Sequence, residues 1–286
     1  MSKKKQAIAC IISAAFFFAL MNLFVKLAGD LPVWQKSMFR NLVAMFIALF
    51  VVIKDRTSLR IERKNFLPMA VRCLAGTVGI ICNFYAIGKL NIADASMLNK
   101  LSPFFAMIFS IFILKEKPKK VEWATIIIAF VGALFVIKPT FNMESFPAIM
   151  GVVSGMGAGL AYACVRKLST NGVAGPVIVF FFSMFSCLSV VPGMIMTYEP
   201  MTIAQFVFLI LAGLSAAGGQ FSITAAYSKA PAKEISVFDY TQVLFAALLS
   251  FVILGDLPDW LSFVGYAVII GVAIYKWKYE VSKKSV

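Results

Sequence analysis

Long apolar runs, separated by short polar breaks, follow one another along the whole chain. An α-helix needs about 20 mostly apolar residues to cross a hydrocarbon layer roughly 30 Å thick, and most runs reach that length. The pattern predicts ten membrane-spanning helices, at about 6–28, 35–53, 66–87, 93–114, 121–138, 147–166, 174–197, 203–227, 233–254 and 260–277. The breaks carry turn residues, as in the Gly-Asp-Leu-Pro sequences at 29–32 and 255–258, and none is long enough for a separate soluble domain. We therefore expect an all-α integral membrane protein.

Composition agrees with this prediction. Hydrophobic residues make up 61% of the chain and charged residues 14%, against roughly half and a quarter in soluble domains. The mean hydropathy is +0.89. The first apolar run follows lysines but is too long for the core of a signal peptide, so we interpret it as the first span.

The 27 basic residues lie mostly on alternate connections. The N-terminus and every second loop after it are rich in Lys and Arg, as at 54–64 and 115–120, whereas the intervening loops hold mainly acids. Short cytoplasmic loops retain positive charge, so we expect both termini in the cytoplasm. The basic tracts favour contact with anionic lipid and include no stripe with exposed aromatics, so no nucleic-acid partner is expected.

The chain also repeats itself at a shift of 140 residues. Without a gap, residues of the first half meet identical or similar residues of the second: Gly79, Lys89, Ser96, Glu116 and Pro118 meet Gly219, Lys229, Ser236, Asp256 and Pro258. We predict two related halves of five spans, residues 1–140 and 141–286. Because five is odd, the second half enters the membrane from the opposite side, and such inverted repeats favour alternating access around a midplane site.

These features resemble the drug/metabolite transporter superfamily, specifically EamA-type transporters with two five-helix repeats, from about Ala9 to Tyr275. The residues that carry the resemblance are Asn22, Lys26, Arg40, Arg72-x3-Gly76-x2-Gly79, Phe84-Tyr85-Ala86-Ile87, Ala93-Asp94-Ala95-Ser96, Pro103, Ser110 and Leu114-Lys115-Glu116. The resemblance implies a multi-pass carrier of a plasma or bacterial inner membrane, for amino acids, nucleoside-like cofactors or drug-like compounds. The second half departs from the pattern, since Ser186 stands where Arg40 would map and Val243 replaces Pro103.

Four ionisable side chains inside the spans are candidates for binding or gating, because such groups are costly in lipid. Arg40 and Arg72 each offer a planar fork that can hold a carboxylate by two hydrogen bonds; alternatively they snorkel to the nearer interface. Lys100 lies next to Asn99, the repeat partner of Asp239. An ion pair between Lys100 and Asp239 would gate the cavity, with Asp239 taking up a proton on separation, or it would be a static pair that stabilises the bundle.

Uncharged polar side chains form a second set of candidates for contact with a polar solute: Asn22, Asn83, Asn99, Gln220, Tyr240 and Gln242. The alternative is interhelical hydrogen bonding, worth about 0.6 kcal/mol on average. Tyr85 and Tyr227 are interpreted as packing residues, with cavity lining as the alternative.

Small and acidic residues at other positions favour structural roles. The glycines at 151, 155 and 159 share one helix face and predict close helix packing, not a dinucleotide loop, because no strand precedes them. Glu116 and Asp256 follow the ends of their spans and are predicted to anchor those ends, with gating as the alternative.

Several function classes are excluded by what the sequence lacks. It has no histidine, and its five cysteines lie in apolar runs without a C-x-x-C pair, so neither a metal site nor a disulfide framework is expected. It has no G-x-S-x-G or H-E-x-x-H motif, and Asn83 stands where a Walker A glycine would precede Gly88-Lys89. We expect no enzyme, no cofactor and no ATP-driven pump.

The sequence thus predicts an alternating-access carrier for a small polar organic metabolite. Three cationic candidates outnumber Asp239, which favours a carboxylate-bearing anion or zwitterion, such as an amino-acid-like compound. Facilitated diffusion, exchange and coupling to a proton or other ion gradient all stay open. The alternatives are an exporter of cationic or neutral compounds, a channel, or a membrane-bound enzyme subunit.

Overall fold

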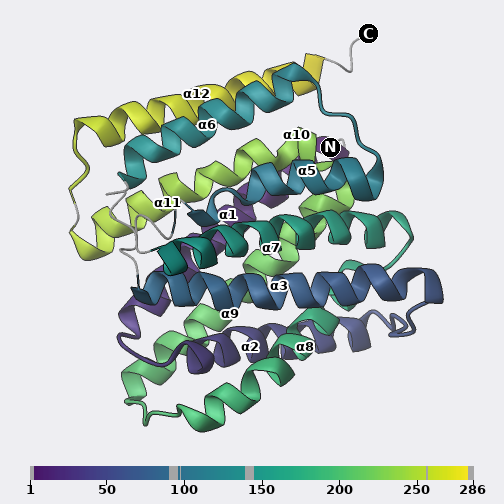
Figure 1. Ribbon diagram of the computed structural model, residues 1–286, viewed down its shortest axis with the longest axis vertical. Helices are drawn as coiled ribbons and strands as arrows, with labels where there is room; N and C mark the ends of the chain where they lie inside the picture. The colour runs from purple at the N-terminus through teal and green to yellow at the C-terminus, as the bar shows by residue number, and fades with distance from the viewer. Residues whose placement is uncertain (1–2, 90–95, 97, 139–144, 256, 283–286) are drawn as a thin grey trace.

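A computed structural model of the chain describes residues 3–89, 96, 98–138, 145–255 and 257–282 (Figure 1). Within these ranges all regular secondary structure is helical. Nine of the described helices are long and apolar enough to cross a membrane, and Ser102–Leu114 is a shorter apolar helix within the predicted fourth span. The all-α membrane architecture is thereby confirmed, while the predicted start of the fourth span lies outside the described residues.

The first half contains five spans: α1 (Lys3–Leu27), α2 (Val33–Lys54), α3 (Arg63–Lys89), α5 (Ser102–Leu114) and α6 (Lys120–Ile137). The second contains α7 (Ser145–Thr170), α8 (Gly175–Met196), α9 (Ile203–Lys229), a ninth span in four pieces and α12 (Trp260–Ser282). The pieces of the ninth span are α10 (Ala232–Ile235), the 3-10 turn η1 (Ser236–Tyr240), α11 (Thr241–Leu249) and the π-helical η2 (Ser250–Leu254).

Local sequence explains how the spans begin and end. Gly29, two residues after the end of α1, and Gly255, directly after η2, take left-handed backbone angles, with φ of 72° and 76°. Glycine adopts this region without steric cost, so it ends a helix sharply. At the start of α9 the Thr202 side chain accepts a hydrogen bond from the Gln205 backbone, which satisfies a free N–H group of the first turn.

The two halves pack as an inverted pair. α1 packs on α9 as α7 packs on α3, and α1 packs on α11 as α7 packs on α5. The equivalent helices α2 and α8 contact each other, as do α6 and α12. α1 and α7 run in opposite directions through the bundle (Figure 1). This exchange of partners is what a pseudo-twofold axis in the membrane plane produces.

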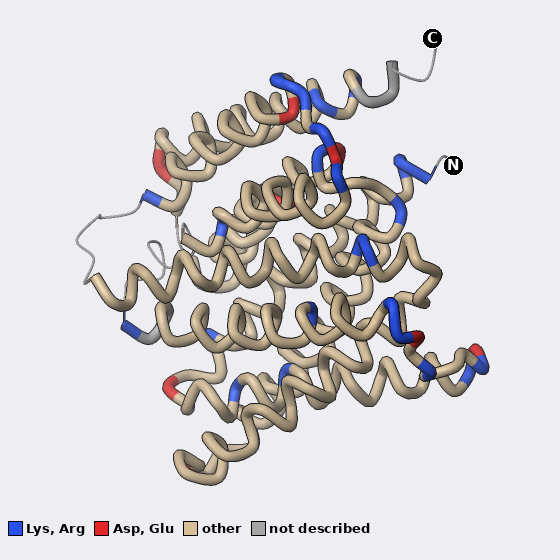
Figure 2. The backbone as a smooth tube through the Cα atoms, turned by 45° about the vertical axis from the view of Figure 1, so that its right-hand side comes forward, with Lys and Arg blue, Asp and Glu red and all other residues tan. Residues whose placement is uncertain are grey.

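The start of α1 and the end of α12 lie at the same end of the bundle, here called the terminal end (Figure 1). Figure 2 shows Lys and Arg gathered at this end. The arrangement matches the predicted alternation of basic and acidic loops, and the assignment of the terminal end to the cytoplasm stays a prediction.

Glycines of α7 allow it to approach two neighbours closely. A Cβ atom at Gly155 would lie 2.8 Å from the Leu98 carbonyl oxygen, and one at Gly159 would lie 2.5 Å from Phe105. On another face, a Cβ atom at Gly157 would lie 2.6 Å from the Ala75 carbonyl oxygen of α3. The predicted packing role of this glycine series is confirmed.

Candidate functional site

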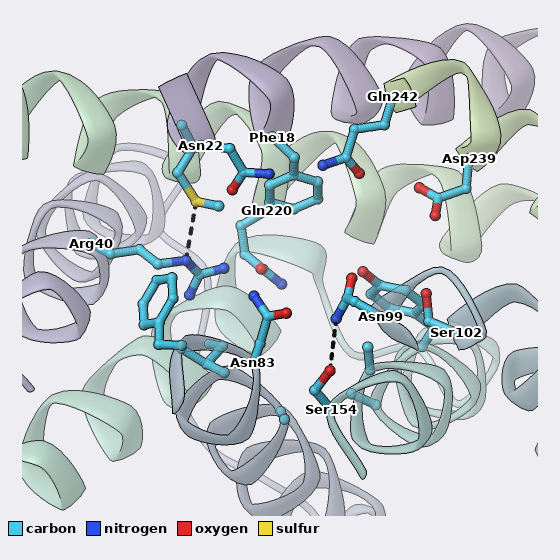
Figure 3. A pocket seen from close by; sticks show the side chains of 18 of the residues that line it. Phe18, Asn22, Arg40, Asn83, Asn99, Ser102, Ser154, Gln220, Asp239 and Gln242 are labelled. Atoms are coloured by element: carbon cyan, nitrogen blue, oxygen red, sulfur yellow. Dashed lines mark hydrogen bonds between the residues drawn. The ribbon is translucent and has the colours of Figure 1, made fainter. Parts of the chain in front are cut away.

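A cavity of about 120 Å³ lies between the two halves, near the middle of several spans. Nine of the ten predicted site residues line it: Asn22, Arg40, Arg72, Asn83, Asn99, Lys100, Gln220, Asp239 and Gln242. They come from α1, α2, α3, the turn before α5, α9 and the ninth span. The helical frame therefore brings together polar residues that are far apart in the sequence (Figure 3).

Arg72 of α3 is held against an aromatic ring. Its side chain is buried, and its guanidinium carbon lies 3.9 Å from the centroid of the Phe182 ring of α8. Gly76, one helical turn after Arg72, makes the space: a Cβ atom there would collide with the guanidinium and lie 2.6 Å from the Phe182 ring. The Nε atom of Arg72 is buried and has no hydrogen-bond partner among the described residues.

Arg40 of α2 is held by weaker partners than a carboxylate. Its Nε donates to the sulfur of Met21 at 3.3 Å, the contact drawn as a dashed line in Figure 3. Its Nη1 donates to the side-chain oxygen of Asn41 at 3.0 Å. A thioether is a poor acceptor, so this guanidinium keeps most of its capacity for an anion.

Lys100 and Asp239 form the predicted pair. The Lys100 Nζ atom lies 3.1 Å from Asp239 Oδ2 and 2.6 Å from the Gln242 side-chain oxygen. Both charged side chains are about 8% exposed. The only carboxylate that lines the described cavity is therefore already paired.

The pair sits where two equivalent spans depart from regular α-helix. Asp239 belongs to the 3-10 turn η1, and Lys100 lies in the turn just before α5, whose first turn contains Pro103. Tyr240 donates its hydroxyl to the Lys100 backbone oxygen at 3.0 Å. Since a broken helix leaves carbonyls unsatisfied inside the membrane, this bond stabilises the interruption. Tyr240 is fully buried there and does not line the cavity.

Amide side chains fill much of the remaining wall. Figure 3 shows Asn22, Asn83 and Gln220 converging on the space in front of the Arg40 head group. The Nε2 atom of Gln220 is buried without a described partner. Asn99 differs, since it donates to the Ser154 hydroxyl at 3.1 Å. Among the described cavity residues, the Gln220 Nε2 and Arg72 Nε atoms are therefore buried donors without a partner.

Packed aromatic residues lie on the side of the cavity toward the terminal end. Tyr162, which lines it, stacks on Tyr227 with ring centroids 4.9 Å apart and planes 17° apart. Beyond this stack, Arg166 Nη1 donates to the Ser228 backbone oxygen at 2.8 Å and ties α7 to the end of α9. Tyr227 thus packs beneath the cavity, as predicted.

The other singled-out residues lie away from the cavity. Tyr85 is 37% exposed and contacts the ring of Phe146. Glu116 follows α5 at the terminal end, where burial raises the pKa of its carboxyl group and Lys233 and Arg166 oppose that rise. Its repeat partner Asp256 lies outside the described residues.

Sequence reasoning missed several residues of the cavity wall, among them Ser154, Tyr162 and Phe182. Serine and aromatic residues are common inside spans, so their residue types carried no signal. The repeat gave one usable hint, because Tyr162 is the counterpart of Asn22, a predicted cavity residue.

The sequence pattern of the EamA-like transporter family matches this chain twice, at residues 5–138 and at residues 145–275. The pseudopaline exporter of Pseudomonas aeruginosa (strain PAO1) is 29% identical over 270 residues, covering 93% of this chain and 94% of the relative. Solute carrier family 35 member G1 of Homo sapiens is 26% identical over 289 residues, with 94% and 79% covered.

A more distant relative, the riboflavin transporter of Vibrio cholerae, is 23% identical over 282 residues, with 95% and 93% covered. A crystal structure of another protein matches with a TM-score of 0.79 at 15% identity, covering 94% of this chain and 95% of that one. This structural match supports the fold alone.

Proposed function

The chain belongs to the EamA-like transporter family, so it is a multi-pass membrane transporter and not an enzyme, and we propose that it is an alternating-access carrier for a small carboxylate-bearing anion or zwitterion. The proposed site is the cavity between the halves. Arg40 and Arg72 bind the carboxylate, and the amides around them orient the rest of the solute.

One observation carries this proposal: two buried guanidinium groups line the cavity, and no described carboxylate pairs with either. A buried charge without a partner is costly, so these two groups favour an anion in the site. The unpartnered Arg72 Nε and Gln220 Nε2 atoms add donors that only an acceptor can satisfy. The Lys100 charge is already balanced by Asp239.

The size of the cavity supports a small solute. Ligand pockets typically enclose about 300–1,000 Å³, whereas this one encloses about 120 Å³. Tyr162 and Tyr227 stack on the side of the cavity toward the terminal end, and in this proposal they close it there. A larger solute enters only after the halves move apart.

The Lys100–Asp239 pair is the proposed gate. It joins the turn before α5 to η1 across the pseudo-twofold axis, so motion of one half against the other changes its geometry. When the pair separates, Asp239 loses its counter-charge and takes up a proton. Coupling of transport to a proton gradient follows from this step.

The basic terminal end supports a cytoplasmic location for both termini, in a plasma or bacterial inner membrane. Inverted halves 1–140 and 141–286, with the site at their interface, support alternating access in preference to a channel. An exporter of cationic or neutral compounds is the second candidate, because Phe18, Tyr162 and Phe182 give the wall aromatic faces.

Thermal-shift screening of the detergent-purified protein separates these candidates. The panel contains small carboxylates, amino acids, neutral solutes and organic cations, tested on the parent, Arg72→Gln and Asp239→Asn. We expect carboxylates to stabilise the parent and not Arg72→Gln. Stabilisation by neutral or cationic compounds alone, equal in all three proteins, would favour the second candidate and return the arginines to structural roles.

Reconstituted vesicles then test the mechanism. The vesicles are loaded with an unlabelled compound that stabilised the parent in the screen. If the protein is a carrier, this compound accelerates entry of its labelled form, because a loaded site returns across the membrane faster than an empty one. Flux that rises far above carrier turnover, without this counterflow, would indicate a channel.

A further inference from the structure

One face of α8 touches the supports of both cavity arginines. Phe182 and Ser186 are four residues apart on this helix and therefore share a face. Both are buried, with exposed fractions of 2% and 1%. Phe182 contacts Arg72 of α3, and Ser186 contacts Asn41, the residue that holds Arg40 on α2. A single face of the second half thus reaches both cationic groups of the first.

The Phe182 contact compensates the charge of Arg72. The face of an aromatic ring carries negative charge density and attracts a cation that lies above it, most strongly where water is excluded. Arg72 is 2% exposed and has no described carboxylate partner. The ring offers no carboxylate or carbonyl acceptor, and Arg72 Nε has no described hydrogen-bond partner, so this N–H group stays available for an oxyanion.

The Ser186 contact fixes the orientation of an amide. Asn41 Nδ2 donates both to the Ser186 hydroxyl at 2.9 Å and to the Ser37 backbone oxygen at 2.9 Å. With its two N–H groups used, Asn41 turns its oxygen to Arg40 Nη1, 3.0 Å away. The opposite amide orientation would place two donors together at Arg40 and two acceptors together at the Ser37 carbonyl. The Ser37 carbonyl therefore sets the amide orientation, and the Ser186 bond from α8 helps to hold the amide that contacts Arg40.

We propose that Phe182 and Ser186 of α8 are positioning and specificity-determining residues that hold the Arg72 and Arg40 guanidinium groups in place for a substrate oxyanion. The second half therefore positions the arginines of the first half and supplies none of its own to the cavity wall described here. Because α8 contacts α2 and α3 across the interface, movement of the halves changes the presentation of both arginines. This inference rests on the proposed anion site.

A series of fluorinated phenylalanines at position 182 tests the Phe182 contact without changing its shape. Each fluorine weakens the negative ring face, so we expect the melting temperature to fall stepwise, by about 2–4 °C per kcal/mol lost. The same series in an Arg72→Met background should be flat. The matched control is the same series at Phe181, the next residue of α8, which contacts Phe180 and does not line the cavity. Equal slopes in the two backgrounds would overturn the cation–aromatic contact.

Binding is then measured with the carboxylate panel in the same proteins. Trifluorination at position 182 should weaken carboxylate binding about tenfold, equivalent to about 1.4 kcal/mol, and should leave the binding of neutral solutes unchanged. If carboxylate affinity depends on Arg72 but does not change along the fluorinated series, Phe182 does not position Arg72 for the substrate, although the anion site stands. If the melting temperature falls along the fluorinated series but no carboxylate binds, the cavity is not an anion site. The contact between Phe182 and Arg72 then has no role in substrate binding.

Ser186→Ala tests the second contact. In vesicles we expect the KM for a carboxylate from the panel to rise several-fold with little change in maximal rate, and Ser186→Thr to restore it. Ser183→Ala is the matched control, since Ser183 is also buried on α8 and its hydroxyl has no described partner. Equal effects of the two alanine variants would overturn the role of Ser186.

Discussion

The two halves of the molecule share a helical frame but differ in the chemistry that they bring to the cavity. α3 and α9 each contain 27 residues and begin 140 residues apart. On this common frame the first half supplies the three cationic groups of the described cavity wall, Arg40, Arg72 and Lys100, whereas the second supplies its one carboxylate, Asp239. Both halves add amides and aromatic rings.

The shared frame and the different side chains suit two separate requirements of a carrier, namely movement of the halves and recognition of the solute. Equivalent backbones let the halves exchange conformations, which is what alternating access needs. Different side chains give the proposed site one cationic wall, which favours one orientation of a polar solute. In the proposed carrier, the symmetric frame thus serves movement and the asymmetric site serves recognition.

The largest expected effect comes from breaking the Lys100–Asp239 ion pair, which joins a cationic group of the first half to the cavity carboxylate of the second. Lys100→Met leaves Asp239 buried without its partner, and should lower the free energy of unfolding by about 3–5 kcal/mol. Thermal melting in detergent measures this. The double variant Lys100→Met with Asp239→Leu should recover most of the loss, because apolar residues can replace a buried pair at little cost.

Transport by the double variant decides between a gate and a static pair. A gate predicts a stable protein that does not move its substrate. Normal transport by the double variant would show that the pair only stabilises the bundle.

The next effect concerns glycine positions where the halves differ. Gly159 packs against Phe105, and its repeat counterpart is Ala19. Gly159→Ala should destabilise the protein by about 1–3 kcal/mol, because the added methyl group overpacks the contact between α7 and α5. Ala19→Gly, as the control, leaves no such clash. A melting temperature unchanged by Gly159→Ala would mean that the two copies tolerate the same side chain.

A smaller effect is expected at Gly76, whose repeat counterpart is Ala216. Gly76→Ala makes the halves alike and pushes the Arg72 guanidinium away from Phe182, since the new methyl group collides with it. Carboxylate binding should weaken about tenfold, or about 1.4 kcal/mol, as measured by ligand-dependent melting. Ala216→Gly is the control and should leave binding near that of the parent. Unchanged binding in Gly76→Ala would show that the position of Arg72 does not matter.

The smallest effect lies at the edge of the bundle, in Asp259 before α12. The nearby Lys138 ammonium, together with hydrogen bonds from Ser262, lowers the pKa of the Asp259 carboxyl group to about 2. A carboxyl pKa that is lower in the folded protein adds stability above about pH 4, and this stability is lost as pH falls toward 2. Melting temperatures between pH 2 and 6 should show this loss in the parent and not in Asp259→Asn. The effect is small, since the pair is exposed to solvent screening.

Much of the frame could be predicted from the sequence. Apolar runs and turn residues predicted the third span at 66–87, against Arg63–Lys89 for α3 in the structure. The shift of 140 residues predicted two halves of opposite orientation. Charges inside the spans pointed to Arg72, Lys100 and Asp239, because ionisable groups are rare there.

The local irregularities could not be predicted in the same way. No proline or glycine marks the 3-10 turn at Ser236–Tyr240, since the interruption depends on the Tyr240 hydroxyl reaching the Lys100 backbone from another span. Phe182 was missed because it is one of 28 phenylalanines, and only its place above Arg72 distinguishes it. The roles of the site residues stay predictions, although the structure brings most of them together.

The most direct test of the account is the binding of matched pairs of ligands that differ only in a carboxylate and its carboxamide. Each small carboxylate of the panel and its amide are titrated against the purified parent and against Arg40→Gln with Arg72→Gln, by ligand-dependent melting. The account predicts that the parent prefers at least one carboxylate over its amide by tenfold or more, and that the double variant loses this preference. If the parent binds amides as well as carboxylates, or if the double variant keeps the preference, the two arginines do not form an anion site.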